Sequence, residues 1–206
     1  MDKGKFIVIE GLDGSGKSTQ IDRLRNKLRL LGVKCCFTRE PSDSIPGGII
    51  RSALTKKAIL EDETISLLFT ADKIEHIKND ILPLLEKGIP VISDRFYLSN
   101  IAYQSVKIEM ETVMKINEIM VMKRLKPDIT IFLDTSPEEC ITRVESERLH
   151  TELYEELEKL RVIQKNYYKA IEILGENEKI VKISSTENVE FTFEKIWDVL
   201  SQYFVV

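Results

Sequence analysis

The stretch KFIVIEGLDGSGKST, residues 5–19, is an apolar strand pattern that ends in the spacing Gly-x-x-x-x-Gly-Lys-Ser at residues 11–18. The glycines of this loop allow positive φ angles and a close approach to an anion, so successive backbone N–H groups can point at the β- and γ-phosphates of a nucleotide. The pattern predicts phosphate contacts from Gly11, Asp13, Gly14, Ser15, Gly16, Lys17, Ser18 and Thr19. A glycine-rich turn without a function is the alternative, and the strand before the loop and the helix after it disfavour that interpretation.

The residues at the end of the loop complete this phosphate site. Lys17 adds a mobile positive charge, and the hydroxyl of Ser18 can bind Mg²⁺. A helix over residues 18–32 turns its positive amino terminus toward the same phosphates. The segment therefore predicts a nucleoside triphosphate site.

Length and composition indicate one globular domain. The chain has 206 residues, of which 43% are hydrophobic and 31% charged, and no apolar stretch approaches the length of a membrane span. The first strand begins without the regions of a signal peptide, so we expect a cytoplasmic protein with no membrane partner. A net charge of −4 argues against a protein that coats nucleic acid. Cys35, Cys36 and Cys140 lack metal-ligand spacing, and we expect reduced packing residues.

Hydrophobic periodicity predicts an α/β fold with a parallel sheet. The expected strands cover residues 6–11, 33–38, 89–94, 128–134 and 178–183, with the second and third buried, and the expected helices cover 18–32, 61–88, 110–125 and 191–204, with another from Pro137. Residues 39–51 carry two prolines and two glycines and are expected to form an irregular loop before a helix that carries Arg51. Because ligands of open α/β sheets bind beyond the carboxyl ends of the strands, this loop is a candidate substrate contact.

The chain lacks the guanine-reading pattern Asn-Lys-x-Asp of GTPases. Its one Asn-Lys pair, at residues 26–27, lies inside the first helix and is followed by Leu28 and Arg29. A kinase of small phosphorylated substrates instead needs many cations, because the donor and the acceptor both carry negative charge. Such cations occur at or near the ends of expected strands and in the helices that follow, at Arg39, Arg51, Lys73 and Arg95.

These residues resemble the thymidylate kinase family over nearly the full chain. The resemblance lies in FIVIEGLDGSGKSTQ, in Arg39-Glu40-Pro41 with Gly48 and Arg51 after it, in LLFTADKIEH, in Asp94-Arg95-Phe96 with SNIAYQ after it, and in KPDITIFLDTSPE. It implies a P-loop kinase fold over residues 1–206, with a five-stranded parallel sheet, helices on both faces and a short lid. It also implies transfer of a phosphoryl group from ATP to dTMP, giving dTDP and ADP for dTTP synthesis, with Mg²⁺ as the cofactor and a homodimer as the assembly.

The resemblance assigns an acceptor site. Phe69 would stack on the pyrimidine, Gln104 would hydrogen-bond the base edge, and Tyr103 would press on the sugar near the 2′ position. The full acceptor set that it implies is Asp13, Arg39, Glu40, Arg51, Phe69, Lys73, Arg95, Ser99, Asn100, Tyr103 and Gln104. From periodicity alone, Phe69 would be a core aromatic of an amphipathic helix, and only the surrounding FTADKIEH pattern favours the base.

The resemblance also assigns catalysis to Lys17, Asp94, Arg95 and Arg148. Arg95 would bind the acceptor phosphate and bridge toward the donor, and Asp94 would hold Mg²⁺ with Ser18. Without the resemblance, a structural ion pair explains Asp94 and Arg95 equally well.

Position 14 is a glycine, and members of the family differ in whether the catalytic arginine sits in the phosphate loop or in the lid. The arginine is therefore expected from a lid at about residues 143–152, with Arg148 closing over the phosphates and Arg143 available to stack on adenine. A solvated helical face explains the same charges.

One residue departs from the family pattern at the base. Where the family commonly places an arginine that contacts the thymine carbonyl, this chain has Lys73, which keeps the charge but lacks the two-pronged donor. The alternatives within enzymes are therefore a kinase for another nucleoside monophosphate such as dUMP, or a deoxynucleoside kinase. A nucleotide-binding regulator that has lost catalysis is a third hypothesis, which intact Lys17, Ser18, Asp94 and Arg95 disfavour.

Overall fold

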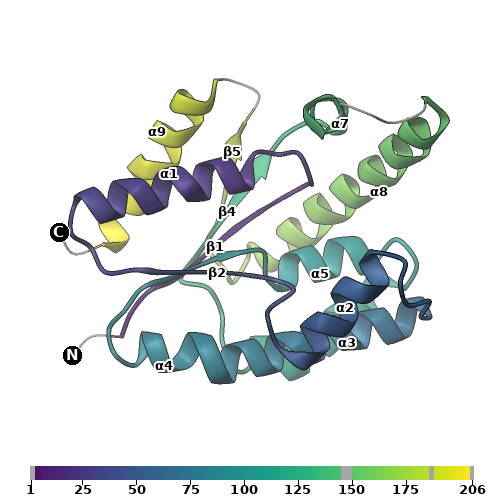
Figure 1. The fold of residues 1–206 in the computed structure, drawn as a ribbon, viewed down its shortest axis with the longest axis horizontal. Coiled ribbons are helices and arrows are strands. Elements are labelled where there is room, and N and C mark those ends of the chain that lie inside the picture. Colours follow the sequence, from purple (N-terminus) through teal and green to yellow (C-terminus); the bar gives the residue numbers. More distant parts are fainter. Residues whose placement is uncertain (1–2, 145–149, 186–187, 205–206) are drawn as a thin grey trace.

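The phosphate-loop strand lies at the centre of a five-stranded sheet in the computed structural model, which describes residues 3–144, 150–185 and 188–204. The strands are β1 (Phe6–Gly11), β2 (Cys36–Arg39), β3 (Val91–Asp94), β4 (Ile129–Asp134) and β5 (Ile180–Ser184), and they follow the order β2-β3-β1-β4-β5 (Figure 1). All four neighbouring pairs are parallel. The predicted α/β class and five-stranded parallel sheet are confirmed.

The register of the sheet brings functional residues to one edge. Asp94 at the end of β3 is paired with Ile9 of β1 and with Arg39 of β2. Gly11, the first glycine of the loop, is paired with Leu133 near the end of β4. The carboxyl ends of the strands therefore converge on the phosphate loop, as expected for an open α/β sheet.

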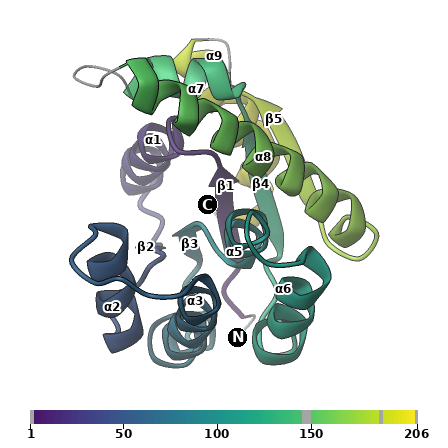
Figure 2. The same cartoon turned by 90° about the vertical axis from the view of Figure 1, so that its right-hand side faces the viewer.

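Helices cover both faces of the sheet, as expected. Helix α1 (Lys17–Leu30) and helix α9 (Val189–Leu200) share one face, where Leu24, Leu28 and Ile196 pack on alternate strand residues (Figures 1 and 2). The other face carries α2 (Ile45–Leu54), α3 (Asp62–His76), η1 (Ile77–Ile81), α4 (Leu82–Leu85), α5 (Tyr97–Gln104), α6 (Met110–Asn117), η2 (Glu118–Met122) and α8 (His150–Leu174). Helix α7 (Pro137–Val144) follows β4, and the short turn η3 (Ser201–Tyr203) follows α9.

Two sequence expectations about the segment after α1 were wrong. Strand β2 was expected to be buried, but it is an edge strand whose residues are half-buried or exposed. The helix that carries Arg51 was expected to follow an irregular loop made by the prolines and glycines of residues 39–51, but this helix, α2, already begins at Ile45. Ser44 caps that helix by accepting a hydrogen bond from the Gly47 amide at 3.1 Å, and Pro46 occupies the first turn, where no amide donor is needed.

The long helices are interrupted in a way that periodicity did not predict. The helix expected over residues 61–88 is helical from Asp62 to Leu85 but contains the π-helical turn η1. This wider turn comes directly before Pro83, which lacks an amide donor and would clash with the carbonyl four residues earlier in a regular helix. A second π-helical turn, η2, ends the helix that starts at Met110.

Among the described residues, no helix is both long enough and apolar enough to cross a bilayer. The described cysteines are free thiols.

Candidate active site

The phosphate loop has the backbone geometry that its glycines allow. Gly11, Gly14 and Gly16 have φ angles of 147°, 84° and 93°. The Lys17 ammonium donates to the carbonyl oxygens of Gly11 at 3.0 Å and Leu12 at 2.7 Å. Burial, with the nearby positive charge of Arg95, lowers the pKa of Lys17 to about 8.

We expect Gly14→Ala to destabilise the protein far more than a comparable change at another left-handed glycine. A Cβ at position 14 would lie 2.3 Å from the Cys140 carbonyl oxygen of α7 and would also be strained at its positive φ. At Gly32, where φ is 71°, a Cβ would meet nothing within 4 Å. In urea unfolding, Gly14→Ala should lower the free energy of unfolding by about 3 kcal/mol and Gly32→Ala by about 1 kcal/mol. Equal losses would show that the contact with α7 does not constrain the loop.

Arg95 lies between the phosphate loop and the helices of the other sheet face. Its φ is 73°, an unusual value for a residue with a side chain. Its Nη2 donates to Asp13 Oδ1 at 2.5 Å and Tyr103 Oη at 3.3 Å, and its Nη1 donates to Ser99 Oγ at 2.9 Å and Tyr167 Oη at 3.3 Å. The guanidinium is thus fixed by four side chains from three parts of the chain.

The charges around Arg95 shift the carboxylates beside it. Burial disfavours ionisation of Asp13, but Arg95 and Lys17 outweigh it and leave the pKa of Asp13 below its ordinary value. Glu10, which is completely buried in β1, has a raised pKa because of its burial. Glu10 and Tyr167 were absent from the sequence-based candidates. Glu10 lies in the strand before the phosphate loop, where its pattern indicates only a buried strand, and the partners of both residues are far away in sequence.

The end of β3 has the features of a cation site next to the loop. Asp94 Oδ1 is buried and has no hydrogen-bond partner among the described residues. Asp94 and Ser18 line one groove together with Arg39. The described residues contain no cluster of three or more His, Cys, Asp or Glu side chains that could hold a metal ion. A Mg²⁺ ion bound by one carboxylate, one hydroxyl, water and nucleotide phosphates needs no such cluster, so the residues present fit it.

A second pocket, here called the acceptor pocket, lies on the other side of Arg95. Its volume is about 420 Å³. It brings together all of the expected acceptor residues except Arg39 and Arg51, namely Asp13, Glu40, Phe69, Lys73, Arg95, Ser99, Asn100, Tyr103 and Gln104. The Oδ1 atom of Asn100 is buried there without a partner among the described residues, so it is available to a ligand donor.

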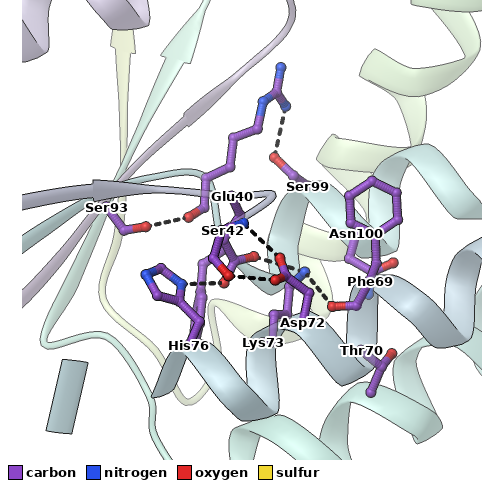
Figure 3. Close-up of polar contacts among 12 residues, drawn as sticks. Glu40, Ser42, Phe69, Thr70, Asp72, Lys73, His76, Ser93, Ser99 and Asn100 are labelled. Carbon is purple, nitrogen blue, oxygen red and sulfur yellow. Dashed lines mark hydrogen bonds and ion pairs between the residues drawn. The ribbon is translucent and has the colours of Figure 1, made fainter. Parts of the chain in front are cut away.

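The wall of the acceptor pocket is a buried polar cluster that sequence analysis missed. Lys73 Nζ lies 2.8 Å from Glu40 Oε2, His76 Nδ1 lies 3.3 Å from Glu40 Oε1, and the Lys73 side chain is only 1% exposed. Asp72 accepts hydrogen bonds from the amide of Ser42 at 2.9 Å and from its hydroxyl at 2.5 Å. Figure 3 shows these side chains gathered near Phe69. These contacts join the segment after β2 to α3. The apolar spacing of α3 did not predict this polar face of the helix.

Three of the remaining predicted cations lie outside the lining of the acceptor pocket. Arg39 is exposed at the edge of the sheet. Arg51 donates to the carbonyl oxygens of Pro41, at 3.3 Å, and Ser42. Arg143, at the end of α7, donates to the Ser185 carbonyl at 2.7 Å.

The fourth, Arg148, lies outside the described residues, as does the middle of the expected lid. Helix α7, which carries Arg143, ends at Val144, and α8 begins at His150.

Comparisons with known proteins agree with the resemblance in the sequence. The family described as thymidylate kinase matches residues 9–196. A thymidylate kinase of Caldicellulosiruptor saccharolyticus is 39% identical over 205 residues, which cover 96% of each chain. A probable thymidylate kinase of Pyrococcus abyssi is 37% identical over 91% of this chain and 92% of its own, and a thymidylate kinase of Prochlorococcus marinus is 36% identical over 98% of each.

Proposed function

This chain belongs to the thymidylate kinase family, and we propose that it transfers the γ-phosphoryl group of ATP to dTMP, giving dTDP and ADP. The observation that carries this proposal is the position of Arg95. It contacts Asp13 of the phosphate loop at 2.5 Å and also lines the acceptor pocket. One guanidinium therefore joins the site expected for the donor to the site expected for the acceptor.

The residues of the loop would hold the donor. The loop amides and Lys17 would bind the phosphates, and Ser18 and Asp94 would hold the Mg²⁺ that accompanies ATP. Bound there, Mg²⁺ supplies charge neutralisation on the phosphates. Arg143 would contact the nucleotide; this is supported by its bond to Ser185, whose hydroxyl donates to the Ser15 carbonyl of the loop.

The acceptor pocket would hold the nucleoside monophosphate. Phe69 offers a face for the base, Asn100 and Gln104 offer amide groups for its polar edge, and Tyr103 lies where it can contact the sugar. Arg95 would bind the acceptor phosphate and stabilise the charge that spreads over the moving phosphoryl group. Arg39 and Arg51 remain proposed phosphate contacts of this site.

A panel of nucleoside monophosphates tests the choice of acceptor. With ATP and Mg²⁺, we expect dTMP to give the highest rate of ADP release. Lys73 stands where the family commonly has an arginine that contacts the base, and its ammonium is paired with Glu40. We therefore expect dUMP to be the acceptor whose rate comes closest to that of dTMP. A strong preference for UMP or CMP over dTMP would overturn the assignment.

The lowered pKa of Lys17 predicts that ATP binding takes up a proton at alkaline pH. In the free protein this ammonium loses its proton near pH 8, and triphosphate binding favours the charged form. Above that pH the apparent affinity for ATP should fall by up to about tenfold per pH unit. Calorimetric titration in buffers of different ionisation enthalpy should show uptake at about pH 9 and little at about pH 7. Absence of uptake at the higher pH would contradict this role of Lys17.

The lid arginine is proposed to be Arg148. We expect Arg148→Ala to lower kcat by at least about tenfold, because it removes a positive charge that would close over the phosphates. Steady-state kinetics of the wild type and of Arg148→Ala give the two kcat values to compare. A change smaller than about threefold, which is under 1 kcal/mol of barrier, would remove Arg148 from the catalytic set.

We also propose a cytoplasmic homodimer. Leu67 of α3 is 56% exposed, and Ile119 and Met120 of the adjoining η2 are 48% and 39% exposed. Such an apolar surface suits a subunit interface. Light scattering should give about twice the chain mass of 23.8 kDa.

A further inference from the structure

Two hydroxyl groups bind Arg95 through Nη1, the nitrogen that does not contact Asp13 of the phosphate loop. Ser99 comes from α5 and Tyr167 from α8, and both accept hydrogen bonds from Arg95 Nη1, at 2.9 Å and 3.3 Å. The two oxygens are also 2.7 Å apart. A hydroxyl can donate or accept, so each accepts from Arg95 only if its own proton points elsewhere.

Glu10 provides the acceptor for those protons. Its Oε2 accepts from the Ser99 hydroxyl and from the Tyr167 hydroxyl, the latter at 3.2 Å. A carboxylate has no proton to donate, so it draws the Ser99 proton toward itself. The Tyr167 proton is then directed to Ser99 Oγ at 2.7 Å or to Glu10 at 3.2 Å, with the Gly11 carbonyl 3.4 Å away, and lone pairs of both hydroxyls face Arg95. Glu10 is completely buried, and no other described carboxylate contacts Ser99 or Tyr167.

The second oxygen of Glu10 fixes the helix that carries much of the acceptor pocket. Oε1 accepts from the backbone amides of Phe96 at 2.8 Å and Ser99 at 3.1 Å. These amides lie at the amino terminus of α5, where the helix's own residues provide no side-chain cap. A buried carboxylate from β1 therefore caps α5 and complements its positive end.

We propose that Glu10 is a positioning residue that orients Arg95 through Ser99 and Tyr167 and so holds the guanidinium toward the acceptor phosphate. This inference rests on the proposed kinase function. Glu10 directly precedes Gly11, whose carbonyl accepts from Lys17, so the same strand end places both the donor lysine and the acceptor arginine.

Glu10→Gln tests this role, because it keeps the shape of the side chain but adds a donor. We expect kcat/KM for dTMP to fall by about 10- to 100-fold, while KM for ATP changes by less than about threefold. The dissociation constant of dTMP should rise, but that of thymidine, which lacks the phosphate, should stay within about twofold.

A matched control separates positioning from the loss of a buried carboxylate. The Glu178 side chain is 5% exposed and accepts from the Tyr97 hydroxyl at 2.6 Å at the start of α5. We expect Glu178→Gln to lower the free energy of unfolding but to leave kcat/KM for dTMP within about threefold of the wild-type value. If both variants lose activity equally, the effect belongs to packing around α5 and the proposal fails.

The decisive test is a double-mutant cycle with Arg95→Met. If Glu10 acts through Arg95, adding Glu10→Gln to Arg95→Met should lower kcat/KM by less than about twofold. A full additional loss, or wild-type kinetics of Glu10→Gln, overturns the proposal. If Glu10→Gln does not fold, Tyr167→Phe removes one hydroxyl from the same chain and must show the same dependence on Arg95. A wild-type protein that does not phosphorylate dTMP would instead refute the proposed function.

Discussion

Arg95→Met is expected to lower kcat for the transfer to dTMP by about 10³-fold or more, the largest effect of any substitution considered for this chain. Methionine keeps much of the volume of the side chain but removes all five N–H donors and the charge. The four hydrogen bonds that hold Arg95 in the free protein show that its position is already set before substrates bind, so little reorganisation is needed during the reaction. Single-turnover measurements with saturating ATP and dTMP would give the rate.

A surface arginine serves as the control for that substitution. Arg161 on α8 pairs with Glu138 and Glu158 at 2.6 Å and is about half exposed. Arg161→Met should leave kcat within about twofold, because exposed ion pairs contribute little. A loss for Arg95→Met of less than about tenfold would mean that the guanidinium does not stabilise the transferring group.

Asp94→Asn is expected to lower kcat/KM for MgATP by about 100-fold and to raise the Mg²⁺ concentration needed for half-maximal activity. Asp94 and Ser18 line the same groove, and Asp94 Oδ1 is buried without a hydrogen-bond partner among the described residues. An amide of the same shape keeps an oxygen there but removes the negative charge that attracts the cation. Activity measured across a Mg²⁺ titration reports both quantities.

Asp134 provides a matched control at the end of the neighbouring strand β4. It is also half-buried, and it accepts from the Tyr168 hydroxyl at 2.7 Å. Asp134→Asn should change the Mg²⁺ requirement by less than about twofold, since this residue lies outside the groove of Ser18 and Asp94. Equal shifts in both variants would show that Asp94 has no special relation to the metal.

The parts of the fold with strong local signals could be predicted from the sequence. Strand β1, the phosphate loop and helix α1 follow one another within residues 6–30, and each is determined by its own residues. Alternating strand and helix patterns indicate a parallel sheet, but they do not give the spatial order β2-β3-β1-β4-β5. The helix that carries Arg51 was expected to start later than α2 does, because Pro46, Gly47 and Gly48 suggest a loop, although they fit the first turn of a helix capped by Ser44.

Helix α5 was missed for a different reason. All residues from Tyr97 to Ala102 are buried, so the helix has no polar face and no helical period in its sequence. Its polar residues Ser99 and Asn100 point to partners from other elements. Such burial depends on the tertiary structure, which a single sequence does not reveal.

The residues of the candidate site also fall into those that the sequence indicates and those that only the folded structure reveals. The phosphate-loop motif supplied Lys17, and family resemblance supplied Asp94, Arg95 and most of the residues that line the acceptor pocket. The contact between Glu10 and Tyr167 had no such signal, because the two residues are 157 positions apart and meet only in the folded protein. The polar face of α3 was likewise hidden behind an apolar pattern that predicts core packing.

The fate of the γ-phosphoryl group tests the central claim most directly. ATP labelled at the γ-phosphorus would be incubated with the protein and Mg²⁺, with and without dTMP, and the products separated. The account predicts that the label appears in dTDP and that turnover requires dTMP. Label recovered only as inorganic phosphate, or no turnover with dTMP present, would contradict it.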